Sequence, residues 1–392
     1  MSEMIERMLR RMRAERSLFG LAVFAILVVV LFSIASDNFL SVINFQSMGF
    51  QVAEVGLLSL AVMLSMLTGG IDLSIVSVAG IAALVAAELF KSQHAATATG
   101  GRALVMTVGF ILVGIAAGTA CGVLNGLIIT KLRVTPILAT LGTMQLLNGI
   151  AIIWTGGMAI YGMPDAFLNI GTGYVARIPV PVIILLVAAA ATAVFVNRTG
   201  IGLRLKLVGA NPTAARYSGL NNDRVLMMTY VASALLSSVA GVLIAARSAS
   251  ANADYGASYV LLAIVIVVLG GVNYSGGSGT VTGVVLAAFV LQFVSSGFNQ
   301  VGFNNFLYSI AQGAILIGVL GLNSVSARWS PSNRFAILGR RRRRGIAPAT
   351  ASSPPAALAS AAPPGALERP DPDQPARGRS QDPGPPPQGG KQ

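Results

Sequence analysis

Long apolar segments separated by short polar stretches recur along the chain as far as residue 323. Segments of this kind are typical of helices that cross about 30 Å of hydrocarbon. Lipid cannot hydrogen-bond an open backbone, so each crossing is predicted to be helical. The predicted fold class is an all-α polytopic membrane protein with about ten transmembrane helices. The predicted spans are 18–36, 47–67, 72–90, 104–129, 135–155, 179–196, 225–246, 259–273, 280–297 and 306–323.

Helix breakers interrupt this pattern at two places. Gly69 and Gly70 separate the second span from the third, and Pro136 lies at the start of the fifth. We therefore expect broken or re-entrant helices there.

Glycine also recurs every four residues in the fourth span, which puts a smooth groove on one helix face. Internal packing is the favoured interpretation, and a subunit interface is the alternative. These glycines are Gly114, Gly118, Gly122 and Gly126.

The composition agrees with a lipid environment. Residues are 54% hydrophobic and only 10% charged, with mean hydropathy +0.73, whereas soluble domains carry about 25% charged residues. The net charge of +13 would suggest nucleic acid in a soluble protein, but here the positive-inside rule explains it and no nucleic-acid partner is expected. With both termini cytoplasmic, the opposite side receives only Lys91, Arg102, Arg177 and Arg247.

Three regions are predicted along the chain. Residues 1–17 form a basic cytoplasmic N-terminus, and 18–323 form the transmembrane domain. The first apolar run is too long for a signal-peptide core, so it is interpreted as an uncleaved span. Residues 324–392 contain a run of arginines, Arg340 to Arg344, and 12 of the 18 prolines lie beyond it. This tail is predicted to be disordered and cytoplasmic, and the arginines either contact anionic lipid or fix topology.

No constellation of catalytic, cofactor-binding or metal-binding residues is recognised. The single cysteine, Cys121, lies in an apolar run, and the single histidine, His94, lies far away in a polar loop. There is no phosphate-binding loop of the ATPase type. The chain is therefore not expected to be an enzyme. If it drives transport with ATP, the ATPase must be a separate partner subunit.

The segment Thr68-Gly69-Gly70-Ile71-Asp72-Leu73-Ser74 places an acidic residue at a predicted helix break. The favoured interpretation is that Asp72 caps free N–H groups of the next helix. Asp72 and Ser74 are alternatively candidates for a pathway or gating role, because buried acids in membranes are costly. Glu54, inside an apolar span, is expected to pair within the bundle.

Two further segments carry polar groups. Thr140, Thr143, Gln145 and Asn148 either line an aqueous pathway for a polyhydroxylated solute or hydrogen-bond between helices. In the longest internal polar stretch, a short helix is predicted after Asn211 as the cap, with Gly219 ending it. A fourth segment contains Gly270, Gly271, Gly276 and Gly277 and is predicted to be a structural turn.

Four motifs in order resemble the permease family of ribose- and xylose-type ABC sugar importers, over about residues 45–323. They are T-G-G-I-D-L-S, T-P-x-x-A-T-L-G, V-G-A-N-x-x-A-A-R-x-S-G and L-G-G-x-x-x-x-G-G-x-G-T. The resemblance implies two permease subunits, as a homodimer or heterodimer, a cytoplasmic ATPase and a periplasmic or lipid-anchored sugar-binding protein. It also implies alternating access and a coupling helix that docks the ATPase, comprising Gly209, Asn211, Ala214, Ala215, Arg216, Ser218 and Gly219.

The chain departs from that family pattern in two places. Val76 stands where glycine is frequent, and Val260 and Leu262 stand where an acidic pair is common. These departures leave open which pentose, hexose, deoxyhexose or sugar-like signal molecule is carried. The competing hypothesis is an ion-coupled secondary transporter, which would need several buried ionisable groups. Glu54 and Asp72 are the main candidates the sequence offers.

Overall fold

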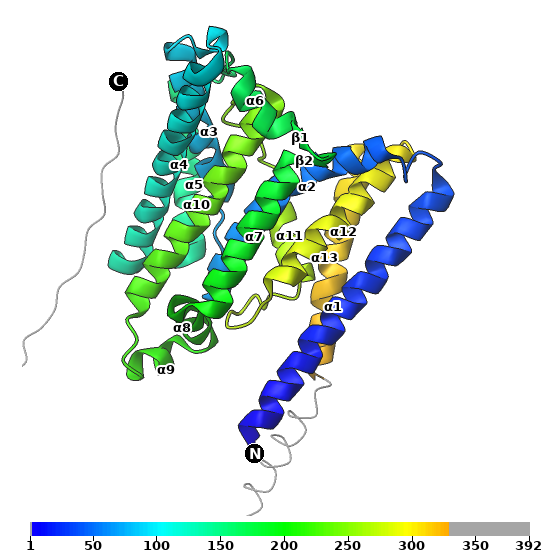
Figure 1. Ribbon diagram of the computed structural model, residues 1–392. Coiled ribbons are helices and arrows are strands. Elements are labelled where there is room, and N and C mark those ends of the chain that lie inside the picture. The colour runs from blue at the N-terminus through cyan, green and yellow to red at the C-terminus, as the bar shows by residue number, and fades with distance from the viewer. Residues whose placement is uncertain (1, 329–392) are drawn as a thin grey trace, which may run out of the picture. The chain divides into compact units, whose positions relative to one another are not determined.

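The computed structural model describes residues 2–328, and within them it is almost entirely helical (Figure 1). The only strands described there are β1 (Tyr174–Val175) and β2 (Ile178–Pro179), which pair antiparallel. The all-α prediction is confirmed. The helices are α1 (Ser2–Ala35), α2 (Val42–Leu67), α3 (Ile75–Ser92), η1 (Ala95–Thr97), α4 (Gly100–Lys131), α5 (Pro136–Thr155), α6 (Asp165–Thr172), α7 (Val180–Arg198), α8 (Gly200–Ala210), α9 (Pro212–Tyr217), α10 (Asn222–Ser248), α11 (Tyr259–Leu269), α12 (Val281–Gln300) and α13 (Asn305–Arg328).

Each predicted span coincides with a helix, so the polytopic architecture is confirmed. Eight helices in the described part are long and apolar enough to cross a membrane, and two shorter apolar stretches lie in α11 and α13. The span predicted at 259–273 was too long, because α11 ends at Leu269 before Gly270 and Gly271. The predicted tail, 324–392, falls outside the described residues from 329 onward.

The core is built around α2 and α10. Every residue of α2 from Val52 to Leu67 is buried. The helix carries few charges, so its sequence does not indicate which face points inward. α10 packs against α2, α3 and α4, and α12 also packs against α2. By contrast, α1 and α4 present many exposed aliphatic side chains. In a membrane protein such outward apolar surface contacts lipid, so burial here reflects helix position rather than hydrophobicity.

The glycine repeat of α4 packs inside the protein. A β-carbon at Gly114 would lie 2.5 Å from the Ala82 carbonyl oxygen of α3, and one at Gly122 would lie 2.7 Å from the Tyr230 carbonyl oxygen of α10. Gly118 and Gly126 face Ser238 and Met227 of α10 in the same way. The favoured interpretation, internal packing, is confirmed, and these positions are not a free subunit interface.

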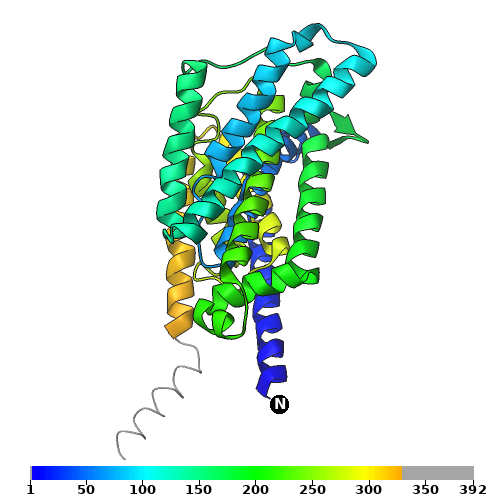
Figure 2. The ribbon, with the colours of Figure 1, turned by 90° about the vertical axis from the view of Figure 1, so that its left-hand side faces the viewer.

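The two ends of the bundle differ in what they carry. α8 and α9 lie at the same end as the start of α1 and the lower end of α13 (Figure 1). The opposite end carries α6 and the β1–β2 hairpin. Figure 2 shows α5 standing at one edge of the bundle, and its contacts are with α3 and α4. One face of α5 is therefore left without a neighbouring helix among residues 2–328.

Candidate functional site

A segment without helical structure, Thr68–Ser74, runs through the interior between α2 and α3. The predicted helix break is confirmed here. The second predicted break is wrong: α5 is continuous from Pro136 to Thr155, because proline at the first position of a helix lacks only an N–H that would be unpaired anyway. We call Thr68–Ser74 the unwound segment.

Side chains satisfy the free backbone groups of the unwound segment. The Asp72 N–H donates to the Ser65 hydroxyl at 3.1 Å, and the Leu73 N–H donates to the Thr140 hydroxyl at 3.1 Å. The Thr140 hydroxyl also lies 3.1 Å from the Ile71 carbonyl oxygen. Non-helical backbone at membrane depth is tolerated only where protein provides such partners. Thr140 therefore joins α5 to the unwound segment.

The Asp72 carboxylate is the centre of a buried hydrogen-bond network and is 2% exposed. One oxygen accepts from the Ser74 N–H (3.0 Å) and the Ser74 hydroxyl (2.6 Å). The other accepts from the Ser233 hydroxyl of α10 at 2.8 Å. The Asn125 amide of α4 donates to the Ser74 hydroxyl at 2.7 Å. We call Asp72, Ser74, Asn125 and Ser233 the Asp72 network.

This geometry corrects the capping interpretation. The residue that precedes α3 is Ser74, and its side chain caps no N–H of that helix. Asp72 bonds the N–H of Ser74 rather than the first turn, and its second oxygen reaches across to α10. The sequence did not point to Ser65, Asn125 or Ser233, since single hydroxyls and amides inside apolar helices have no distinguishing spacing.

The second buried carboxylate, Glu54, forms an ion pair with Arg247, the last basic residue of α10. The Arg247 Nη2 donates to Glu54 Oε2 at 3.0 Å, and Nε donates to the other oxygen. Tyr259, the first residue of α11, hydrogen-bonds to the same pair. The prediction that Glu54 pairs inside the bundle is confirmed. The partner is one of the few basic residues predicted for the opposite side of the membrane.

The four polar candidates on α5 point in different directions. Thr140 and Thr143 are buried, and the Thr143 hydroxyl bonds the Thr140 carbonyl oxygen at 3.2 Å. Gln145 is exposed, and its amide has no hydrogen-bond partner within residues 2–328. Asn148 is half-buried, and its Oδ1 has no partner in the described part. Of these four residues Gln145 alone is exposed, on the face of α5 that no helix in the described part of the chain covers.

That open face of α5 is smooth around Gln145. Gly142 lies three residues before Gln145 and Gly149 lies four residues after it, so all three lie on one side of the helix. A β-carbon at either glycine would meet no atom within 4 Å. An amide facing hydrocarbon midway along a membrane helix is costly, so this face requires water, solute or another subunit beside it.

The predicted short helix after Asn211 exists as α9. The Asn211 side chain accepts from the Ala214 N–H at 2.9 Å, and Pro212 is the first helical residue. At its end, the Gly219 N–H bonds Arg216 O and the Leu220 N–H bonds Ala215 O, with Gly219 at φ +79°. This pair of bonds is a Schellman motif. α9 is thus closed at both ends, while its last residue, Tyr217, is 90% exposed.

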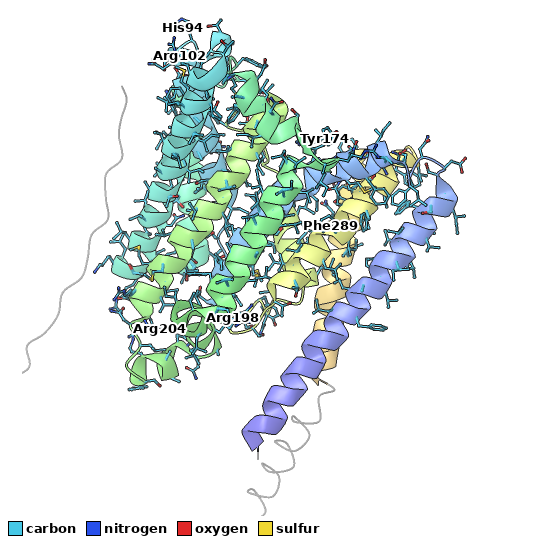
Figure 3. The ribbon with its side chains drawn as sticks, in the orientation of Figure 1. His94, Arg102, Tyr174, Arg198, Arg204 and Phe289 are labelled. Carbon is cyan, nitrogen blue, oxygen red and sulfur yellow. The ribbon has the colours of Figure 1, made fainter. Side chains whose placement is uncertain are left out.

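Basic residues gather at the end of the bundle that carries α8 and α9. Arg198 and Arg204 lie there, whereas His94 and Arg102 lie at the opposite end (Figure 3). Arg216 lies on α9 itself.

The four glycines predicted to form a turn lie in the connection between α11 and α12. Gly271, Gly276 and Gly277 adopt positive φ there, which a residue with a β-carbon adopts only at a cost.

These features define a class: a multi-pass membrane protein with a broken helix in its core and a capped surface helix between two spans. In the part that the structure describes, no group of acidic, histidine or cysteine residues could hold a metal ion. The family model described as "Branched-chain amino acid transport system / permease component" matches residues 44–320. The chain therefore belongs to this family of transport permease components.

Its curated relatives are import permeases. The chain is 34% identical to the ribose import permease protein RbsC of Bacillus subtilis, over 75% of this chain and 89% of the relative. It is 34% identical to the galactose/methyl galactoside import permease protein MglC of Escherichia coli K12, over 78% and 94%. It is 33% identical to the autoinducer 2 import system permease protein LsrD of Escherichia coli O157:H7, over 78% and 92%. No solved structure matches.

Proposed function

We propose that this chain is the membrane-spanning permease of an ATP-driven importer of a monosaccharide or sugar-like molecule in a bacterial inner membrane. The relatives named for ribose, galactose and autoinducer 2 support a sugar-like substrate over an amino acid. In this proposal the chain performs no covalent chemistry. A separate ATPase hydrolyses ATP, a binding protein delivers the solute, and a second permease subunit, identical or related, completes the pathway.

The observation that carries the proposal is α9. A six-residue helix has little intrinsic stability, yet α9 is capped at both ends and packed through Ala215 and Leu220. It presents Tyr217 and Arg216 outward. Exposed tyrosine and arginine on a rigid element are typical anchors of protein interfaces. We therefore assign α9 as the helix that docks in the ATPase. Ala214 and Arg216 are exposed on it, Ala215 packs it against the protein, and Asn211, Ser218 and Gly219 form its ends. Gly209 is buried in α8 just before it, so it supports α9 rather than contacting the ATPase.

In this assignment α8 and α9 face the cytoplasm, which is also the side predicted for both termini. The basic residues gathered at that end, including Arg198 and Arg204, agree with the positive-inside rule. The binding protein then approaches the end that carries α6 and the β1–β2 hairpin. Membrane lipid covers the exposed aliphatic surfaces of α1 and α4.

The open face of α5 is proposed to line the solute pathway opposite a second permease subunit. The Gln145 amide offers both donors and an acceptor, which suits the hydroxyl groups of a sugar. Gly142 and Gly149 leave room beside it. Asn148 lies on the edge of the same face. Asp72, Ser74 and Thr140 are instead proposed to act in gating, because they hold the unwound segment. Thr143, whose hydroxyl bonds only the Thr140 carbonyl oxygen of its own helix, is proposed to be structural.

A secondary transporter is less well supported by the same residues. Ion coupling needs ionisable groups that can exchange their ion during transport. Glu54 is held by Arg247, and Asp72 by two serines. The particular sugar stays open, since Val260 and Leu262 replace the acidic pair common in ribose- and xylose-type permeases.

The docking of α9 is tested with the double variant Ala214→Glu, Tyr217→Ala. Both positions are exposed, so the variant is expected to insert normally. In the assembled complex it should lose ATPase co-purification and ATP-dependent uptake. The matched control is Ala96→Glu, Tyr161→Ala, which makes the same exchanges at exposed sites near the other end. Normal ATPase binding by the α9 variant would refute the docking assignment.

A further inference from the structure

Three segments that are far apart in the sequence meet at the end of α8. They are the end of α2 with the glycines that follow it, the last turn of α8, and the connection between α11 and α12. The Gly277 N–H donates to the Leu67 carbonyl oxygen at 3.0 Å, which joins two of them directly. Gly276 lies beside Gly209 and Gly69, which joins all three.

The contacts are made by backbone against backbone. A β-carbon at Gly209 would overlap the Leu67 carbonyl oxygen and lie 2.7 Å from the Gly277 nitrogen. A β-carbon at Gly276 would lie 2.8 Å from both the Gly69 nitrogen and the Gly209 carbonyl oxygen. No side chain can be accommodated between the segments at these points. We call Gly69, Gly209, Gly276 and Gly277 the glycine junction.

The junction lies between two elements already described. Gly209 is two residues before Asn211, the cap of α9. Gly69 lies in the unwound segment, three residues before Asp72. The unwound segment is thus held at one end by the glycine junction and at the other by the Asp72 network. Between these two points it is not helical, and its backbone is bonded to the Ser65 and Thr140 side chains.

We propose that the glycine junction transmits the displacement of α9 into the unwound segment, so that docking and ATP-driven movement at α9 reposition Asp72. This inference rests on the proposed function. Close-packed backbone contacts transmit displacement because they leave no compressible side chain or void between the parts. A side chain at Gly209 would push α8 away from Leu67 and break this transmission without touching α9.

The test is Gly209→Ala in the full complex of permease, ATPase and binding protein in proteoliposomes. Sugar taken up per ATP hydrolysed should fall about tenfold, which is a typical size for a coupling between two sites, while ATPase binding and hydrolysis persist. The matched control is Gly200→Ala on the same helix, where a β-carbon meets nothing within 4 Å. It should transport as the wild-type protein does. Tightly coupled uptake by Gly209→Ala would overturn the proposal.

Hydrogen–deuterium exchange on the wild-type complex tests the proposal even if Gly209→Ala does not fold. Addition of a non-hydrolysable ATP analogue should change exchange in residues 67–74 and 273–279 together with 209–217. A change confined to 209–217 would overturn the transmission while leaving the docking of α9 intact. If the wild-type complex neither binds the ATPase nor takes up sugar with ATP, the proposed function itself fails, which is a separate result.

Discussion

The two buried carboxylates of the core are held in opposite ways. Glu54 meets a guanidinium, so its charge is balanced by Arg247 across α2 and α10. Asp72 meets hydroxyl groups and one backbone N–H, so its described partners are neutral. Glu54 lies in a continuous helix, whereas Asp72 lies in the unwound segment.

The Glu54–Arg247 ion pair is a rigid link, which we call the Glu54 brace, whereas the hydrogen bonds of Asp72 can rearrange. An ion pair in a low-dielectric core resists separation, because either charge alone would be left buried. Hydrogen bonds to serine hydroxyls can be exchanged singly for other hydroxyls or for water. The core therefore joins α2 to α10 rigidly at Glu54, and it joins the unwound segment to α10 more loosely at Asp72, where movement is proposed. Substitutions can alter either region separately.

Loss of the Glu54 brace should have the largest effect on stability. Arg247→Met leaves the Glu54 carboxylate buried without a cation, and the free energy of unfolding should fall by about 3 kcal/mol. Unfolding of the purified protein in mixed micelles measures this. Arg177→Met, at an exposed arginine that forms no ion pair within residues 2–328, is the control and should change little. Equal stabilities of the two variants would contradict a bracing role.

Removal of the Asp72 carboxylate should cost less. Asp72→Ala leaves the Ser74 and Ser233 hydroxyls without their acceptor, which lowers the free energy of unfolding by about 2 kcal/mol. It should also reduce ATP-dependent uptake, because the unwound segment loses its link to α10. The control is Asp37→Ala at an exposed carboxylate. Undiminished uptake by a well-folded Asp72→Ala would show that the network is structural only.

A smaller effect is expected on the other side of the unwound segment. Thr140→Val keeps the shape of the side chain but leaves the Leu73 N–H unpaired, at a cost of about 1 kcal/mol. Thr143→Val is the matched control on the same helix, because its hydroxyl bonds only the Thr140 carbonyl of its own helix. The two variants are compared by the same unfolding assay. A larger loss from Thr143→Val would be inconsistent with this account.

The smallest stability effect is predicted at Gln145. Gln145→Leu removes an amide with no partner in the described chain, so the free energy of unfolding should change by less than about 0.5 kcal/mol. Uptake should nevertheless fall, since the proposed pathway loses its central polar group. Ile153→Leu, at an exposed apolar position of the same helix, should leave both quantities unchanged. Unchanged transport by Gln145→Leu would remove α5 from the pathway.

Local signals in the sequence predicted much of the fold. Hydropathy located the spans, and Asn211, Pro212 and Gly219 defined both ends of α9 because capping depends on neighbouring residues. The partners of long-range contacts could not be predicted. Nothing near Glu54 indicates Arg247, and nothing near Gly209 indicates Gly277, since these pairs form only when helices are packed. Nothing in the sequence indicated which polar residues of α5 are buried and which are exposed. Only the packing of the helices distinguishes the exposed Gln145 from the buried Thr140.

If this chain forms the pathway of an ATP-driven sugar importer, transport must depend on ATP and on the partner proteins. This is tested by uptake of radiolabelled ribose and galactose into proteoliposomes that contain this chain with its proposed ATPase and binding-protein partners. The importer assignment predicts uptake of at least one sugar that requires ATP and all three components and persists without ion gradients. Uptake by this chain alone, driven by a proton or sodium gradient and indifferent to ATP, would contradict it.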